Sequence, residues 1–119
     1  MRPLVVKVTC GAEDAERCNQ AFTVAGAAAA AGADVTLWLT GEAAWLGLPG
    51  RAEAFDLPLA TPLADLLELV AQSGDVVVCS QCAARRAITE DLLRPGVRIA
   101  GAAVFAEQVL QPEVQALVY

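Results

Sequence analysis

The chain has 119 residues, 56% of them apolar, and carries a formal net charge of −6 at pH 7. This length predicts a single domain over residues 1–119, and the acidic balance argues against binding to nucleic acid or membrane surfaces, which relies on clustered Lys and Arg. Because Lys7 interrupts the first apolar stretch and no apolar run is long enough to span a bilayer, we expect a cytoplasmic protein without a signal peptide.

Apolar strands and helical segments alternate from the start of the chain. Residues 3–9 predict a strand, and Gly11 leads into a helix that ends near Gly32 and turns one apolar stripe inward. That stripe consists of Cys18, Phe22, Ala25 and Ala29. A second strand is expected over 35–40 and a short helix over 41–46, so Cys18 is expected in the core.

The second half continues this alternation after an irregular stretch over residues 47–60. A helix is expected from Thr61-Pro62 to Gly74, because Thr caps helix starts and Pro fits the first helical turn. The remaining elements are a strand over 75–79, a short helix, a strand over 97–100, a helix over 102–110 and a strand over 114–118. This order indicates an α/β fold whose mostly parallel sheet, of about five strands, is covered on both faces.

Two cysteines stand where the active groups of such sheets gather, at the carboxyl ends of strands. Cys10 and Cys79 each end a strand, and Cys79 opens a Cys-x-x-Cys sequence that continues into a helix. Backbone N–H groups and the dipole at a helix start favour an anion, so we expect a lowered pKa at Cys79. Arg85 and Arg86 lie one turn beyond Cys82 and are candidates for tuning the thiolate or attracting an anionic donor.

Other interpretations of the Cys-x-x-Cys pair are a thioredoxin-like redox pair, two buried thiols, or half of a zinc site. Zinc would need Cys10 and Cys18 as well, but these are separated by seven residues and the chain has no histidine. The lack of histidine also excludes a Cys-His or Ser-His hydrolase, whereas thiolate attack on sulfur needs no separate general base. We therefore favour sulfur transfer without metal or cofactor. In it, Cys79 is the nucleophile and Cys82 either a resolving thiol or a spectator.

Several segments together resemble one known family. The first group of segments covers residues 76–88, 91–92 and 96–102 and contains the run Val-Val-Val-Cys-Ser-Gln-Cys. A second set covers 21–25 and 32–42. Their order is similar to the cysteine region, first helix, second strand and following turn of the DsrE/DsrF-like family of small sulfur-relay proteins. One departure is Arg86-Ala87, where the family often has Arg-Gly.

This resemblance implies a three-layer α/β/α fold and homo-oligomers such as trimers or hexamers. It also implies a sulfurtransferase-like role, in which Cys79 carries a persulfide from a protein donor to a protein acceptor. The alternatives are a thiol–disulfide or peroxide reductase and a noncatalytic oligomeric binding module. Because apolar residues are abundant and precede the irregular stretch, we expect Trp45, Leu46 and Leu48 to help bury a subunit interface.

Overall fold

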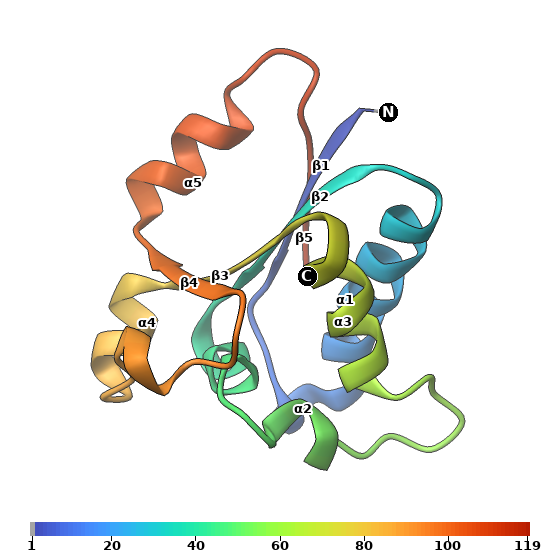
Figure 1. The fold of residues 1–119 in the computed structure, drawn as a ribbon, viewed down its shortest axis with the longest axis vertical. Helices are drawn as coiled ribbons and strands as arrows, with labels where there is room; N and C mark the ends of the chain where they lie inside the picture. Colours follow the sequence, from blue (N-terminus) through green and yellow to red (C-terminus); the bar gives the residue numbers. More distant parts are fainter. Residues whose placement is uncertain (1) are drawn as a thin grey trace.

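A five-stranded parallel sheet forms the centre of the protein, whose computed structural model describes residues 2–119 (Figure 1). The strands are β1 (Pro3–Val8), β2 (Asp34–Leu39), β3 (Asp75–Cys79), β4 (Val97–Ala100) and β5 (Gln115–Val118). Their order is β4-β3-β2-β1-β5, and every neighbouring pair is parallel. The α/β fold, the parallel sheet and its five strands are as predicted.

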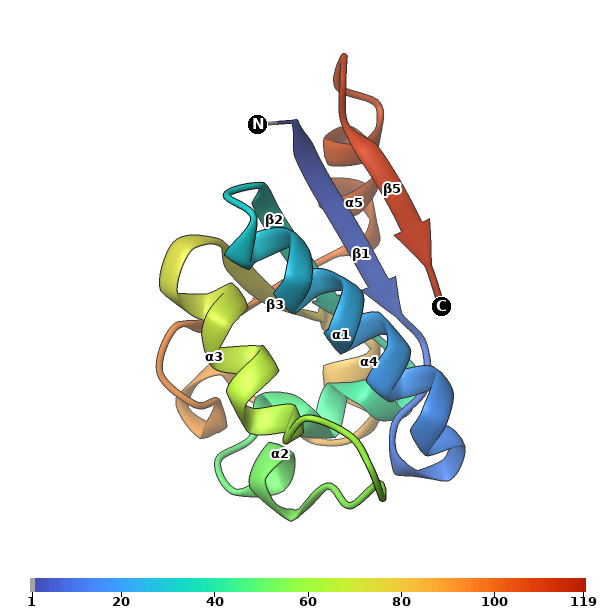
Figure 2. The same ribbon diagram turned by 90° about the vertical axis from the view of Figure 1, so that its right-hand side faces the viewer.

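Helices cover the two faces of the sheet unequally. In Figure 2, α1 (Ala15–Ala30) and α3 (Leu63–Ser73) lie in front of the strands, and α5 (Ala102–Val109) lies behind them. This is the three-layer arrangement expected. The shorter elements are η1 (Ala12–Asp14), η2 (Gly41–Gly47), α2 (Arg51–Ala54), α4 (Ser80–Arg85) and η3 (Glu90–Leu92).

Two segments differ most from the sequence-based expectation, and the other boundaries agree with it to within one or two residues. The stretch over 47–60 is not wholly irregular, because α2 forms within it. The helix expected from Thr61 begins at Leu63, and the Thr61 side chain does not cap it. None of the helices within residues 2–119 combines the length and the apolar character needed to cross a membrane.

The larger core lies between the sheet and the layer formed by α1 and α3. It includes Cys18, Phe22 and Ala25, the predicted inward stripe of α1, and Ala29 packs against it. Apolar side chains every three or four residues on α3 meet the same strands, as the periodicity predicts.

A smaller core lies under α5 on the opposite face. Its buried members are Val5, Trp38 and Val77. Trp38 is 1% exposed, meets the Phe105 ring edge-on at a centroid distance of 5.4 Å, and donates from Nε1 to Gln108 at 2.9 Å. Within residues 2–119 α5 is the one helix on this face, and its position depends on few side chains.

Candidate functional site

The Cys-x-x-Cys pair lies at the carboxyl end of β3. The strand ends at Cys79 and α4 begins at Ser80, as predicted. The sulfur-bearing residues Cys79 and Cys82 are half-buried, whereas Cys10 and Cys18 are buried. The structure therefore separates the four cysteines into an accessible pair and a buried pair.

The environment of Cys79 favours the thiolate. Burial raises the pKa of Cys79, but the backbone N–H groups of Cys82 and Gln81, the Cys82 side chain and the charge of Lys7 outweigh it, and the net pKa lies below its usual value. Backbone N–H groups at the start of α4 thus have the effect expected from a helix start. Thiolate is the nucleophilic form of cysteine, so the lowered pKa makes Cys79 a candidate nucleophile.

Lys7, the single lysine of the chain, supplies the positive charge near Cys79. It lies on β1 in register with Trp38 and Val118, which places it on the face covered by α5. Its Nζ lies 4.9 Å from the centre of the Phe105 ring. Sequence reasoning noted Lys7 only as a break in an apolar stretch. A lone lysine inside an otherwise buried strand was the signal that could have identified it.

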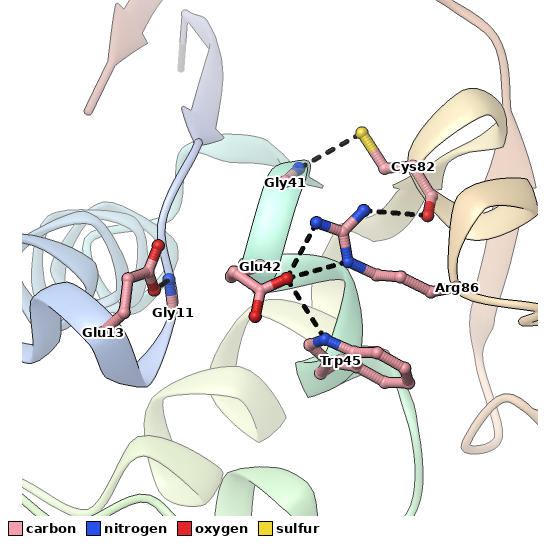
Figure 3. A network of polar contacts seen from close by, with 7 residues as sticks. All are labelled: Gly11, Glu13, Gly41, Glu42, Trp45, Cys82 and Arg86. Carbon is pink, nitrogen blue, oxygen red and sulfur yellow. Dashed lines mark hydrogen bonds and ion pairs between the residues drawn. The ribbon is translucent and has the colours of Figure 1, made fainter.

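The two arginines predicted to tune the thiolate are placed differently. Arg85 is exposed, and Arg86 directs its guanidinium to Glu42 and to the Cys82 carbonyl (Figure 3). The charge of Arg86 is therefore offset by a carboxylate 2.8 Å away. Arg86 joins the cysteine helix to η2, and the cation that lowers the pKa of Cys79 is Lys7.

Replacing Lys7 by methionine is expected to raise the pKa of Cys79, because the thiolate loses a nearby positive charge. Alkylation of Cys79 at pH 7 should then slow, while at a pH well above both values the rates should converge. Quenched iodoacetamide labelling followed by peptide mass spectrometry measures this. A Lys7→Arg protein keeps the charge and serves as the matched control; equal slowing in both variants would contradict an electrostatic role.

The second sulfur contacts the loop that follows β2. The backbone N–H of Gly41 donates to Cys82 Sγ at 3.2 Å, and neighbouring Glu42 accepts from both Arg86 and Trp45 (Figure 3). Donation from Arg86 lowers the pKa of Glu42, so this carboxylate stays ionised at neutral pH. The expected spacing of Cys82 and Arg86 on one helix face is confirmed, since the Arg86 side chain reaches the Cys82 carbonyl at 3.1 Å.

The buried cysteines have the opposite character. Burial raises the pKa of Cys18 to about 12 and also raises the pKa of Cys10. The prediction that Cys18 is a core residue is confirmed by its 0% exposure. In the described residues no three His, Cys, Asp or Glu side chains are grouped to hold a metal ion.

The turn after α4 forms although it contains no glycine. Ala87 has a φ of 54°, in the left-handed region where glycine is favoured. The backbone N–H of Ile88 nevertheless bonds to the Ala83 carbonyl at 2.9 Å and closes the helix end. The Arg86-Ala87 sequence thus forms this turn without a glycine.

A cavity of about 280 Å³ lies next to the Glu42 and Arg86 pair, between η1, η2 and α2. Its walls include the rings of Trp45 and Phe55, and the Arg51 guanidinium lies 4.7 Å from the centre of the Trp45 ring. Carboxylates and a guanidinium both line it, so its charge does not favour one class of small molecule.

Known proteins similar to this chain were found by comparing sequences. The model of the DsrE/DsrF-like family matches residues 4–115. The uncharacterized protein MJ0760 of Methanocaldococcus jannaschii is 31% identical over 108 residues, which make up 90% of this chain. The chain spans only 39% of the length of that curated relative.

Solved structures share the fold at low sequence identity. The YchN protein of E. coli superposes with a TM-score of 0.82 at 23% identity, and each chain is covered completely. MTH1491 of Methanobacterium thermoautotrophicum, a protein of unknown function, gives a TM-score of 0.69 at 11% identity, again over both whole chains. With the family model matching nearly all of the sequence, the chain belongs to the DsrE/DsrF-like family.

Proposed function

We propose that this protein is a sulfur-relay protein that carries a persulfide on Cys79 and passes the terminal sulfur to a partner protein. The main support for the proposal is that its cysteines differ in exposure and in pKa. Cys79 is half-buried with a lowered pKa, whereas Cys10 and Cys18 are buried with raised pKa values. Membership of the DsrE/DsrF-like family supports the same role.

The chemistry is two successive displacements at sulfur. The Cys79 thiolate attacks the terminal sulfur of a donor persulfide, a new sulfur–sulfur bond forms, and the donor leaves as a thiolate. An acceptor thiolate then attacks the outer sulfur on Cys79, which returns to the thiolate. Neither step needs an external oxidant or reductant, because the sulfur is transferred without a net change in oxidation state. Neither step needs a general base once the thiolate has formed.

A second candidate function is a thiol–disulfide reductase, favoured by the Cys82 side chain, which is among the groups that lower the pKa of Cys79. In that case Cys79 would attack a substrate disulfide and release one substrate thiolate, and Cys82 would then attack the mixed disulfide and release the second one. The Cys79–Cys82 disulfide left on the protein must be reopened by a reductase. A reversible disulfide with a potential in the thioredoxin range, and turnover with a reductase, would favour this activity over sulfur carriage.

Incubation of the reduced protein with glutathione persulfide, followed by intact mass spectrometry, tests the proposal. We expect the mass of one sulfur atom per chain to be added and then removed by dithiothreitol. If the wild-type protein gains no sulfur, persulfide carriage is wrong and the reductase becomes the leading function.

Assembly into a homo-oligomer is also part of the proposal, but through a different surface from the one expected. Leu46 is 5% exposed and belongs to the larger core, and Trp45 and Leu48 pack against that core. The expected interface at these residues is therefore wrong for Leu46. Large apolar side chains instead remain exposed on or beside α5 and β5, where Val118 is 63% and Leu110 is 80% exposed.

We expect Val118→Arg to convert the oligomer to smaller species at micromolar concentration, because a charge would be buried where the α5 face meets a second copy. Multi-angle light scattering measures the molar mass. Leu69→Arg is the matched control, since Leu69 is also an exposed apolar residue but lies on α3 across the sheet. A monomeric wild-type protein, or equal effects of both variants, would contradict this interface.

A further inference from the structure

The cavity beside the Glu42 and Arg86 pair is lined by two further charged side chains. They are Glu13 and Arg51, and among residues 2–119 neither takes part in an ion pair. We propose that this cavity binds a free α-amino acid with an apolar side chain, whose ammonium group contacts Glu13 and whose carboxylate contacts Arg51. This binding site goes beyond the proposed sulfur carriage and does not depend on it.

The other carboxylates near the cavity are already paired. Glu42 accepts from Arg86 at 2.8 Å, and Glu53, which is close to Arg51 in the chain, pairs with Arg94 at 3.3 Å. The summed charge of the lining therefore selects neither anions nor cations, but the placement of the charges is more specific than their sum. In the described part of the chain, one carboxylate and one guanidinium at this cavity are left to meet a ligand.

These two groups stand at the two ends of a connected row of contacts. Glu13 accepts from the Gly11 N–H, and a Cβ added to Gly11 would lie 2.8 Å from the Glu42 carbonyl oxygen, so η1 packs against the start of η2. Glu42 also accepts from Trp45 Nε1 at 3.3 Å, and the Arg51 guanidinium lies over the Trp45 ring, 4.7 Å from its centre. Figure 3 shows Gly11 and Glu42 between Glu13 and Trp45. A small molecule that contacts both ends must carry both a positive and a negative charge.

The size and the walls of the cavity fit an amino acid. Its volume of about 280 Å³ is close to the lower end of the range for small-molecule sites, roughly 300–1,000 Å³. The half-buried rings of Trp45 and Phe55, together with Leu46, offer an apolar surface to a side chain. A guanidinium held over an indole keeps its in-plane N–H donors, which match the two oxygens of a carboxylate. Peptide bonds remove both backbone charges of a residue inside a chain, so the ligand class is the free amino acid.

Isothermal titration calorimetry of the reduced protein with leucine, methionine and phenylalanine tests the proposal. We expect at least one of them to bind. Its N-acetyl derivative lacks the positive charge and its carboxamide lacks the negative charge, so each should bind at least about tenfold more weakly. The proposal is overturned if none of the three amino acids binds at roughly 10 mM, a concentration that detects even weak complexes. It is also overturned if either derivative binds as tightly as its parent amino acid.

Two variants assign the two ends of the ligand. Arg51→Gln should weaken amino acid binding by about tenfold and leave the affinity for the carboxamide unchanged, because that ligand has no carboxylate. Glu13→Gln should act in the same way toward the N-acetyl derivative. Arg85→Gln and Glu16→Gln are the matched controls, since each removes an exposed charge of the same sign outside the cavity and should bind like the wild type. Equal losses in the controls would overturn the site, and circular dichroism melting checks that each variant keeps the fold.

Discussion

A Cys79→Ser protein will take up no sulfur from glutathione persulfide, whereas the wild-type protein will gain one sulfur atom per chain. A serine hydroxyl is not ionised at neutral pH and cannot displace a persulfide sulfur, while the lowered pKa of Cys79 supplies a thiolate. Loading by the wild type should slow as the pH falls below the pKa of Cys79, because protonation removes the nucleophile. Intact mass spectrometry over a pH series measures both effects.

Two further variants show whether the loss is specific to Cys79. Cys82→Ser keeps a hydrogen-bond donor beside Cys79 and should still load one sulfur atom. Cys18→Ala removes a buried thiol away from the strand end and should load like the wild type. If Cys79→Ser loads and Cys82→Ser does not, the roles of the two cysteines are reversed.

Truncation of Trp38 is expected to give the largest loss of stability. Its indole is 1% exposed in the small core beneath α5, and its removal leaves a cavity that so few neighbours cannot fill. We expect Trp38→Ala to lower the free energy of unfolding by about 3–5 kcal/mol. The polar cost adds to this, because Gln108 loses the donor that its side-chain oxygen accepts from at 2.9 Å.

The chain offers a matched tryptophan for comparison. Trp45 is only half-buried, at the wall of the cavity near α2. Trp45→Ala should therefore lower the free energy of unfolding by clearly less than Trp38→Ala does. Urea unfolding followed by circular dichroism, at one fixed protein concentration, gives both free energies without depending on indole fluorescence. A Trp45→Ala protein as unstable as Trp38→Ala would show that the α5 face contributes less than its packing implies.

The sequence predicted the fold well where local patterns determine structure. Valine-rich strands and a three- to four-residue apolar period locate β3 and α3 without tertiary information. The short α2 was missed because a single helical turn has no periodicity to read. Residues 51–54 become helical between η2 and α3, where Ala52 is buried in the larger core.

The candidate site was only partly predictable, because its chemistry depends on residues far apart in the chain. The start of α4 at Ser80 explains why Cys79 was identified, since a strand followed by a helix is a local signal. Lys7 and Gly41 reach the site through strand order, which places β2 beside β3 and β1 on the other side of β2. The spacing of Arg86 from Cys82 predicted a positive charge near the cysteines. The ion pair between Arg86 and Glu42, which offsets that charge, joins residues far apart in the chain and has no signal in the sequence.

Because Cys10 and Cys18 are buried, labelling of their thiols can be used to measure unfolding. Their thiols become available to a labelling reagent only when α1 opens from the sheet, whereas Cys79 stays accessible in the folded state. In one sample the extra mass at Cys18 therefore reports opening events, and the mass at Cys79 reports the thiol that is accessible in the folded protein. The free energy of opening and the fraction of competent protein can be followed together in the same spectrum, without a fluorophore or an added tag.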